Sequence, residues 1–288
     1  MTLELLALHP KTRAHAEAFL SQPSHALLIC GPQGSGKRSL AIAMAEQALR
    51  LGDGQLADHP YAAHITPIEG KAISIEAVRD LEHFLSLRVP SKQKISRAII
   101  IEDAHLLTLQ AQNALLKTLE EPPTGTIIFL TARSEASLLP TIRSRSQLLQ
   151  LIRPDVSLLQ DFFFSQGYQD VEIKRAFALS GGLTGLTQAL LSQTEHPLLP
   201  ATEKAREILS GTTYQRLILV DELSKQKSLC EDILFILQQM AHVSLQSATL
   251  TNSVKWQKIM TASYEAAEAF KANAQPKLVL TNLMLQLS

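Results

Sequence analysis

The sequence predicts an α/β domain with a parallel sheet around a phosphate-binding loop, followed by segments that are helical only. Two patterns predict the first part: a glycine-rich loop between a buried strand and a helix, and a second apolar strand that ends in two acids. The second part is predicted because strand-like apolar runs cease after Ile152, whereas helical periodicity continues. The 288 residues are enough for more than one domain.

The first elements lead into the loop. Residues 10–21 predict a short helix, and His25–Cys30 predicts a buried strand. The glycine-rich loop Gly31–Lys37 follows at once, and a helix is expected over residues 39–49. In this order the backbone amides and the helix N-terminus hold phosphates, and the lysine adds a point charge. The candidate phosphate-binding residues are Gly31, Gly34, Gly36 and Lys37.

The segment up to the central strand is less regular. Ile65–Ile68 predicts a strand, and Ser74 can cap a helix that runs to about Leu87. Ser91–Lys94 is interpreted as a solvated basic loop, with a phosphate contact as the alternative. A metal held by the histidines here is not expected, because the segment has no thiolate and irregular ligand spacing. The residues concerned are His59 and His64, with Asp53 and Asp58 nearby.

The central strand is predicted at Ala98–Ile101, and Glu102 and Asp103 follow it directly. A helix capped by Thr108 leads to a second buried strand at Thr126–Thr131. Acids at the carboxyl end of a parallel strand lie where such sheets bind ligands. The alternative is two core strands with solvated acids, and the upstream phosphate loop argues against it.

Only helices are expected after Ile152. Three short helices over residues 155–191, broken near Gly167 and Gly181-Gly182, predict a small domain. Glu195–Pro197 marks a linker before the last helical block. The stripe of Phe235, Leu237, Met240 and Val243 in that block is interpreted as core, or as a seam against another subunit. The expected domains are residues 1–153, 154–194 and 195–288, and the expected late helices lie near 201–210, 213–226, 228–248, 253–271 and 276–287.

Composition limits the partners. Lys plus Arg and Asp plus Glu both number 27, so no overall basic field indicates a nucleic-acid-binding protein. DNA contacts would be local or made through partners. The two distant cysteines, Cys30 and Cys230, indicate a reduced, cytoplasmic protein. No apolar run reaches the roughly 18 residues of a membrane span, and the N-terminus lacks the pattern of a signal peptide.

One motif pair carries a resemblance. Asn113–Pro123 reads Asn-Ala-Leu-Leu-Lys-Thr-Leu-Glu-Glu-Pro-Pro, and Ser144-Arg145-Ser146 follows it. The pair resembles the clamp-loader branch of the AAA+ ATPases, which has Ser-Arg-Cys at the second position. The resemblance covers nearly the whole chain. It implies a P-loop domain, a helical lid and a collar that joins subunits in a ring, with gamma/tau and delta subunits, the sliding clamp and primed DNA as partners.

The nucleotide-binding residues depart from active members of this family. Arg38 stands where a Ser or Thr ligates Mg²⁺, and Ser39 comes one residue late, about 100° further round the helix. Glu102-Asp103 reverses the family's Asp-Glu order. The position of the γ-phosphate-sensing Thr falls on Ala132 or Arg133, and Thr184 replaces a later arginine. The family's four-cysteine zinc module is also missing, so no zinc is expected.

These departures imply a subunit that does not hydrolyse ATP, although ATP or ADP binding at Lys37 stays open. In the family such a stator subunit gives an arginine to a neighbour's nucleotide, and the matching residue is Arg145. We expect Arg145 to follow a strand–turn segment at a subunit boundary. The alternatives are a structural arginine that pairs an acid, a working motor ATPase of the gamma/tau type, favoured by Lys37 and the acidic pair, and a nucleotide kinase, which leaves the helical last third unexplained.

Overall fold

The computed structural model describes residues 3–287 except 69–70, 88, 90–93 and 248–249. Of the predicted basic loop, residues 91–93 lie outside this described part. The chain divides into two compact units, residues 1–153 and 154–288. The expected boundary between residues 194 and 195 stays a prediction. No helix among the described residues combines the length and apolar character that crossing a membrane requires.

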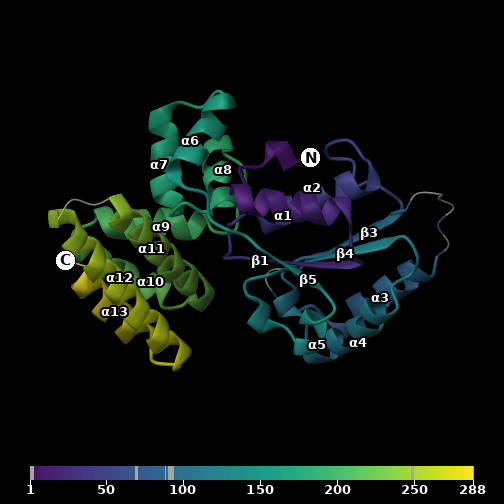
Figure 1. Cartoon of the computed structure of the whole chain (residues 1–288). Helices are drawn as coiled ribbons and strands as arrows, with labels where there is room; N and C mark the ends of the chain where they lie inside the picture. Colours follow the sequence, from purple (N-terminus) through teal and green to yellow (C-terminus); the bar gives the residue numbers. More distant parts are fainter. Residues whose placement is uncertain (1–2, 69–70, 88, 90–93, 248–249, 288) are drawn as a thin grey trace. The chain divides into compact units, whose positions relative to one another are not determined.

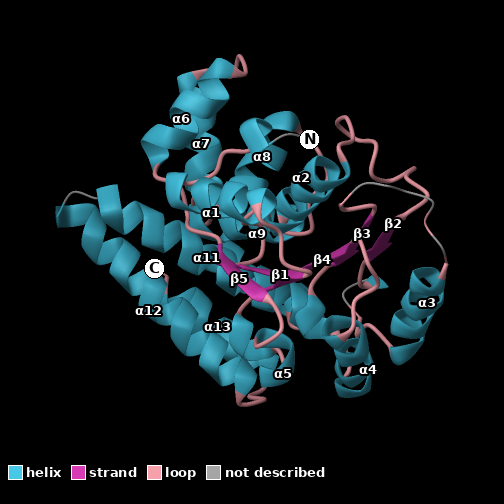
Figure 2. Ribbon diagram, turned by 45° about the vertical axis from the view of Figure 1, so that its right-hand side comes forward, coloured by secondary structure: helices cyan, strands magenta, loops and turns pink. Residues whose placement is uncertain are grey.

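The first unit contains, within the described residues, a five-stranded parallel sheet in the order β2-β3-β4-β1-β5 (Figure 2). The three central strands, β3, β4 and β1, are buried along their whole length because helices cover both faces of the sheet. The predictions for these three strands are confirmed. The strands are Ala26–Cys30 (β1), Ala62–Ile65 (β2), Arg97–Ile101 (β3), Thr126–Ala132 (β4) and Gln147–Gln150 (β5).

Two hydrophobic clusters lie on the two faces of this sheet. Helices α1 and α2 pack on one face, and α3, α4 and α5 pack on the other (Figure 1). The predicted cap of α4 is confirmed, because the Thr108 hydroxyl accepts a hydrogen bond of 3.1 Å from the N–H of Ala111. The helices are Pro10–Ser21 (α1), Lys37–Leu49 (α2), Ile75–Ser86 (α3), Leu109–Glu120 (α4) and Pro140–Arg143 (α5).

Two local predictions in this unit are wrong, and one strand is not predicted at all. The edge strand β2 occupies Ala62–Ile65, so it begins before the predicted segment Ile65–Ile68 and ends at its first residue. The strand β5 has mostly exposed residues and a single buried one, Leu149, which gives no apolar run to detect. The segment before Arg145 is the short helix α5, not a strand, because Pro140 favours the first turn of a helix.

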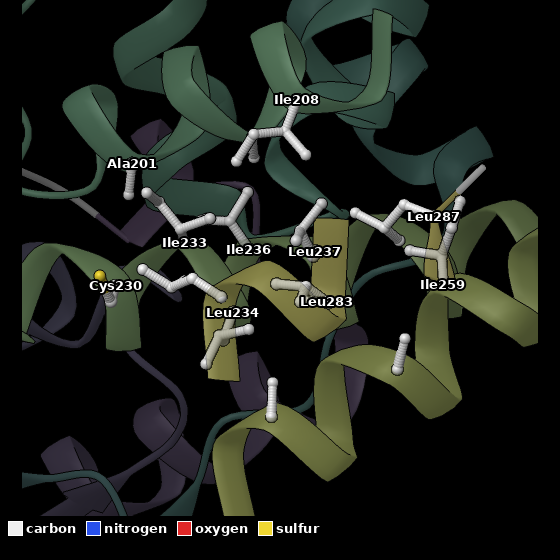
Figure 3. Close-up of a cluster of buried hydrophobic side chains, with 14 of the residues drawn as sticks. Ala201, Ile208, Cys230, Ile233, Leu234, Ile236, Leu237, Ile259, Leu283 and Leu287 are labelled. Atoms are coloured by element: carbon white, nitrogen blue, oxygen red, sulfur yellow. The ribbon is translucent and has the colours of Figure 1, made fainter. Parts of the chain in front are cut away.

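The second unit is helical throughout its described residues. One hydrophobic cluster joins the helices α8 to α13 of this unit, and α11 contributes Ile233, Ile236 and Leu237 to it (Figure 3). Met240 and Val243 are buried as well, which supports the core interpretation of that stripe. The helices are Val156–Ser165 (α6), Asp170–Ser180 (α7), Thr184–Ser192 (α8), Leu199–Ser210 (α9), Thr213–Leu223 (α10), Lys227–Ser247 (α11), Leu250–Lys271 (α12) and Pro276–Gln286 (α13).

Candidate functional site

The phosphate loop connects the carboxyl end of β1 with the first turn of α2. Gly34 and Gly36 have φ angles of 76° and 90°, a left-handed backbone conformation that residues other than glycine rarely adopt. A Cβ on Gly31 would lie 3.1 Å from the Cβ of Leu151, so the backbone closely approaches the residue that follows β5. These glycines let the loop turn back on itself and direct its amides to one side, as phosphate binding requires.

Lys37 is the first residue of α2 and is only 7% exposed. Its Nζ donates a hydrogen bond of 3.0 Å to the carbonyl oxygen of Pro32 in the same loop. Burial lowers the pKa of the Lys37 amine, and the carboxylate of Asp103 opposes this shift. The predicted loop lysine and the second acid are therefore close enough to interact electrostatically.

Arg38 makes the contact that matters most for metal binding. Its Nε lies 3.0 Å from Oε1 of Glu102 at the end of β3. The same oxygen lies 2.5 Å from Nε2 of His64 in β2. The Glu102 side chain is 12% exposed, so a nearly buried carboxylate is shared by two nitrogen donors. The predicted Ser39 lies half-buried in the first turn of α2, one residue beyond the position from which a P-loop hydroxyl reaches the metal.

Asp103 follows with a left-handed backbone, φ 44° and ψ 50°. Its N–H donates a hydrogen bond of 2.9 Å to the hydroxyl of Thr131 in β4. Its carboxylate lies 3.9 Å from Nδ1 of His105. Burial lowers the pKa of His105, which favours the neutral imidazole beside this acid.

The aligned sensor position also differs from that of active relatives. Arg133 donates a hydrogen bond of 3.0 Å from its Nη2 to the side-chain oxygen of Gln33 in the phosphate loop. Ala132 is buried and pairs with Cys30 in the sheet, so it presents no polar group. Of the two residues expected at the sensor position, Arg133 therefore contacts the phosphate loop and Ala132 does not.

The contacts of two residues of this site are not predicted from the sequence. His64 is considered there only as a metal ligand, and the predicted strand begins one residue after it, whereas β2 contains it. Thr131 is expected only as part of a core strand, and its bond to the N–H of Asp103 depends on the pairing of β3 with β4. The strand-end position of Thr131 is the one sequence signal that could have identified it.

His59 and His64, for which no metal is expected, contact different partners. His64 contacts Glu102, whereas Nδ1 of His59 accepts a hydrogen bond of 3.3 Å from the N–H of Tyr61. Within the described part of the chain, no three His, Cys, Asp or Glu side chains gather as a metal site would require.

Arg145 lies in the turn between α5 and β5. Its Nη2 is 2.7 Å from Oε1 of Glu120 at the end of α4, and its Nη1 donates to the carbonyl oxygen of Thr141 at 3.1 Å. The Arg145 and Glu120 side chains are 35% and 50% exposed. They line an open hollow of about 470 Å³ together with Ser24, His25, Leu119, Ser144, Ser146 and Gln147.

This hollow and the phosphate loop lie at opposite ends of β1. Ser24 and His25, which line the hollow, come directly before β1, whereas the loop comes directly after it. Five residues at about 3.3 Å each separate the two ends by roughly 15 Å. The structure thus brings Lys37, Arg38, Glu102, Asp103 and Arg133 together and leaves Arg145 apart from them.

The parallel sheet, its phosphate loop and the following helical segments define an AAA+ P-loop protein. The gamma subunit-related protein of DNA polymerase III from Thermotoga maritima has a similar fold, with a TM-score of 0.54 and 20% identity over 96% of this chain and 98% of that one. The family model "DNA polymerase III, delta subunit" matches residues 12–155, and the chain belongs to this family.

Curated relatives agree with that assignment. The chain is 34% identical over 172 residues to DNA polymerase III subunit delta′ of Haemophilus influenzae, covering 55% of this chain and 52% of the relative. It is 28% identical over 282 residues to the delta′ subunit of Yersinia pestis, covering 88% and 74%. The chain thus spans about half the length of the Haemophilus relative.

Proposed function

We propose that this chain is the delta′ subunit of a clamp loader of bacterial DNA polymerase III, acting as a stator. In this role it supplies Arg145 to the nucleotide of a neighbouring ATPase subunit and does not hydrolyse ATP itself. It thereby helps to load the sliding clamp on primed DNA during replication. The observation that carries the proposal is the position of Arg145 at the end of β1 opposite to its own phosphate loop.

That position argues against action within one chain. An arginine must reach the oxygens of the transferring γ-phosphate to stabilise their charge. A separation of roughly 15 Å along β1 exceeds the length of an arginine side chain. Arg145 can therefore serve only a phosphate bound by another molecule, and its partly exposed guanidinium in an open hollow suits that use.

The ion pair with Glu120 is compatible with two roles of Arg145. It can be an arginine finger, which acts on the nucleotide of a neighbouring subunit, or a structural arginine that pairs an acid. Both side chains are partly exposed, and exposed ion pairs contribute about 1 kcal/mol or less. A phosphate carries more charge and matches the planar fork of the guanidinium, so it can displace the carboxylate. We infer that Glu120 orients Arg145 in the isolated chain and releases it to a neighbour's nucleotide.

The altered nucleotide site supports the stator over the motor. Phosphoryl transfer needs Mg²⁺, a positioned water and charge-stabilising groups together. Here Arg38 contacts the carboxylate of Glu102, the expected sensor-threonine position holds Ala132 or Arg133, and the expected sensor-arginine position holds Thr184. The motor alternative keeps the support of Lys37 and of the T. maritima gamma-related fold, and ATPase activity of the isolated chain would favour it.

The partners follow from the same proposal. Gamma/tau and delta subunits would contact the helical block from residue 195 onward, which acts as the collar, and one neighbour would contact the Arg145 face. The sliding clamp and primed DNA would be met within the assembly, in the cytoplasm. The delta′ relatives support this set of partners through their membership of DNA polymerase III.

The test replaces Arg145 in a reconstituted clamp loader. Arg145→Ala should leave assembly intact and slow ATP hydrolysis at one neighbouring site by roughly 10³-fold or more, while total turnover falls less because other sites still act. Arg145→Lys should not restore the rate, since an ammonium lacks the bidentate fork. DNA-stimulated ATPase and clamp loading are the measurements, and the chain alone should show no appreciable turnover.

Glu120→Gln is the matched control, because it breaks the same ion pair and keeps the arginine. A finger predicts near-normal turnover for Glu120→Gln and slow turnover for Arg145→Ala. Equal loss in both variants would assign Arg145 a structural role through Glu120. Wild-type rates with Arg145→Ala in an intact assembly would exclude the finger altogether.

A further inference from the structure

The AAA+ fold implies Mg²⁺ beside the nucleotide, and the side chains of this site do not fit that ion. Mg²⁺ needs near-octahedral oxygen ligands at about 2.0–2.1 Å, and a P-loop supplies one of them from the hydroxyl after its lysine. That residue is Arg38, whose side chain has no oxygen to offer. Its Nε lies 3.0 Å from the carboxylate of Glu102, the acid at the end of β3.

A divalent cation would also be repelled by positive charge at this site. Oε1 of Glu102 already accepts from Nε of Arg38 and contacts Nε2 of His64. The guanidinium is permanently charged, so an incoming metal would be repelled at the position where it would need to bind.

The phosphate-binding side of the site is intact by contrast. The loop keeps its left-handed glycines, and Lys37 is almost fully buried at the start of α2. Arg38 pairs with Glu102 through Nε, and its side chain is 64% exposed, so the guanidinium is accessible to a bound anion. Arg133 adds a further cation beside the loop through its bond to Gln33.

We propose that Arg38 is a tethered cation that takes the place of Mg²⁺ at Glu102, so that this loop binds the phosphates of a nucleoside diphosphate or triphosphate without a divalent metal. The inference goes beyond the stator role and does not depend on Arg145. It makes Arg38 a specificity-determining residue, because it decides whether the site accepts the bare nucleotide or its metal complex.

The test titrates fluorescently labelled ADP into the isolated full chain, once in EDTA and once in MgCl₂. Binding should be at least as tight in EDTA as in MgCl₂, because Mg²⁺ in solution converts ADP into a metal complex that this site does not favour. Absence of binding in EDTA, or affinity that rises tenfold or more with Mg²⁺, would overturn the proposal. Electron paramagnetic resonance with Mn²⁺ and ADP provides a second readout, and wild-type protein should immobilise no metal.

Arg38→Ser restores the hydroxyl of the family pattern and removes the guanidinium. Its affinity for ADP in EDTA should fall roughly tenfold or more, the worth of one charge-assisted hydrogen bond, and Mg²⁺ should restore it. Mn²⁺ should then be immobilised with ADP. Metal-independent binding unchanged in Arg38→Ser would overturn the proposal.

Two further variants keep this result interpretable. Arg38→Gln retains much of the length of the side chain without its charge, so it should lose affinity in EDTA even if Arg38→Ser does not fold. Wild-type affinity in both folded variants would count against the proposal. Arg79→Ser makes the same charge change on the exposed surface of α3 and should bind ADP like the wild type.

Discussion

Both cysteine thiols are buried, one in each of the two units. Cys30 ends β1 directly before the phosphate loop, and the Sγ–H of Cys230 in α11 donates to the carbonyl oxygen of Leu223 at 3.0 Å. Burial is the main cause that raises the pKa of each thiol from 9.0 to about 11. Both thiols are therefore protonated and shielded in the native protein at neutral and mildly alkaline pH.

We expect neither cysteine to react with Ellman's reagent at pH 8 in the native chain, and both to react in guanidinium chloride. The thiolate is the reacting species, and here it forms at higher pH than in an unfolded chain. Because the folded pKa is the higher one, stability should fall as the pH rises from 9.0 toward about 11. A rapidly reacting native thiol would contradict the burial of that residue.

The turn between α7 and α8 depends on a glycine at one position. Gly181 caps α7 in a left-handed conformation, φ 60°, and the turn packs directly on α11. A Cβ on Gly181 would lie 2.4 Å from the Cβ of Gln239 and 2.5 Å from its backbone carbonyl carbon. The predicted helix break near Gly181-Gly182 is thus also a close approach between helices.

Gly181→Ala should destabilise the chain by about 3 kcal/mol. This value combines the strain of a left-handed alanine with the cost of overpacking against Gln239. Gly167→Ala is the matched control, because Gly167 has φ 93° and open space around its Cβ position. It should cost only about 1 kcal/mol of conformational strain. Urea unfolding of both variants measures the difference, and equal losses would mean that the contact with Gln239 relaxes at no cost.

On the scale of the whole molecule, each unit has a hydrophobic core of its own. Residues 1–153 enclose one sheet between two apolar clusters, and in residues 154–288 one cluster joins the helices α8 to α13. A unit with its own core can fold alone. The collar role proposed for the last helices would therefore be carried by a part of the chain that does not need the sheet.

Fragments 1–153 and 154–288 should each unfold cooperatively in urea when they are produced separately. A fragment that ends at residue 120 is the control, because it lacks β4, which pairs with both β3 and β1. That fragment should not fold. Circular dichroism during urea titration measures all three, and a non-cooperative transition in either unit would show that the cores depend on each other.

Local sequence pattern determines much of this molecule. The strands β1, β3 and β4 are continuous apolar runs because both of their faces are covered, and such runs are visible without any partner. The phosphate loop and its departures at Arg38 and Glu102 are visible because they depend on residue type at a fixed spacing. The family motif likewise predicts Arg145 as a candidate site residue from residue type and spacing alone.

Tertiary structure decides what depends on pairing between distant segments. β5 has no apolar run and is a strand only because it pairs with β1 at the sheet edge. His64 and Glu102 meet because β2 and β3 are parallel neighbours, although 38 positions separate them in the chain. The separation of Arg145 from its own phosphate loop depends on the length and direction of β1 in the sheet. The number of residues between two side chains does not give the distance between them in space. That distance is set by which strands pair and in which register.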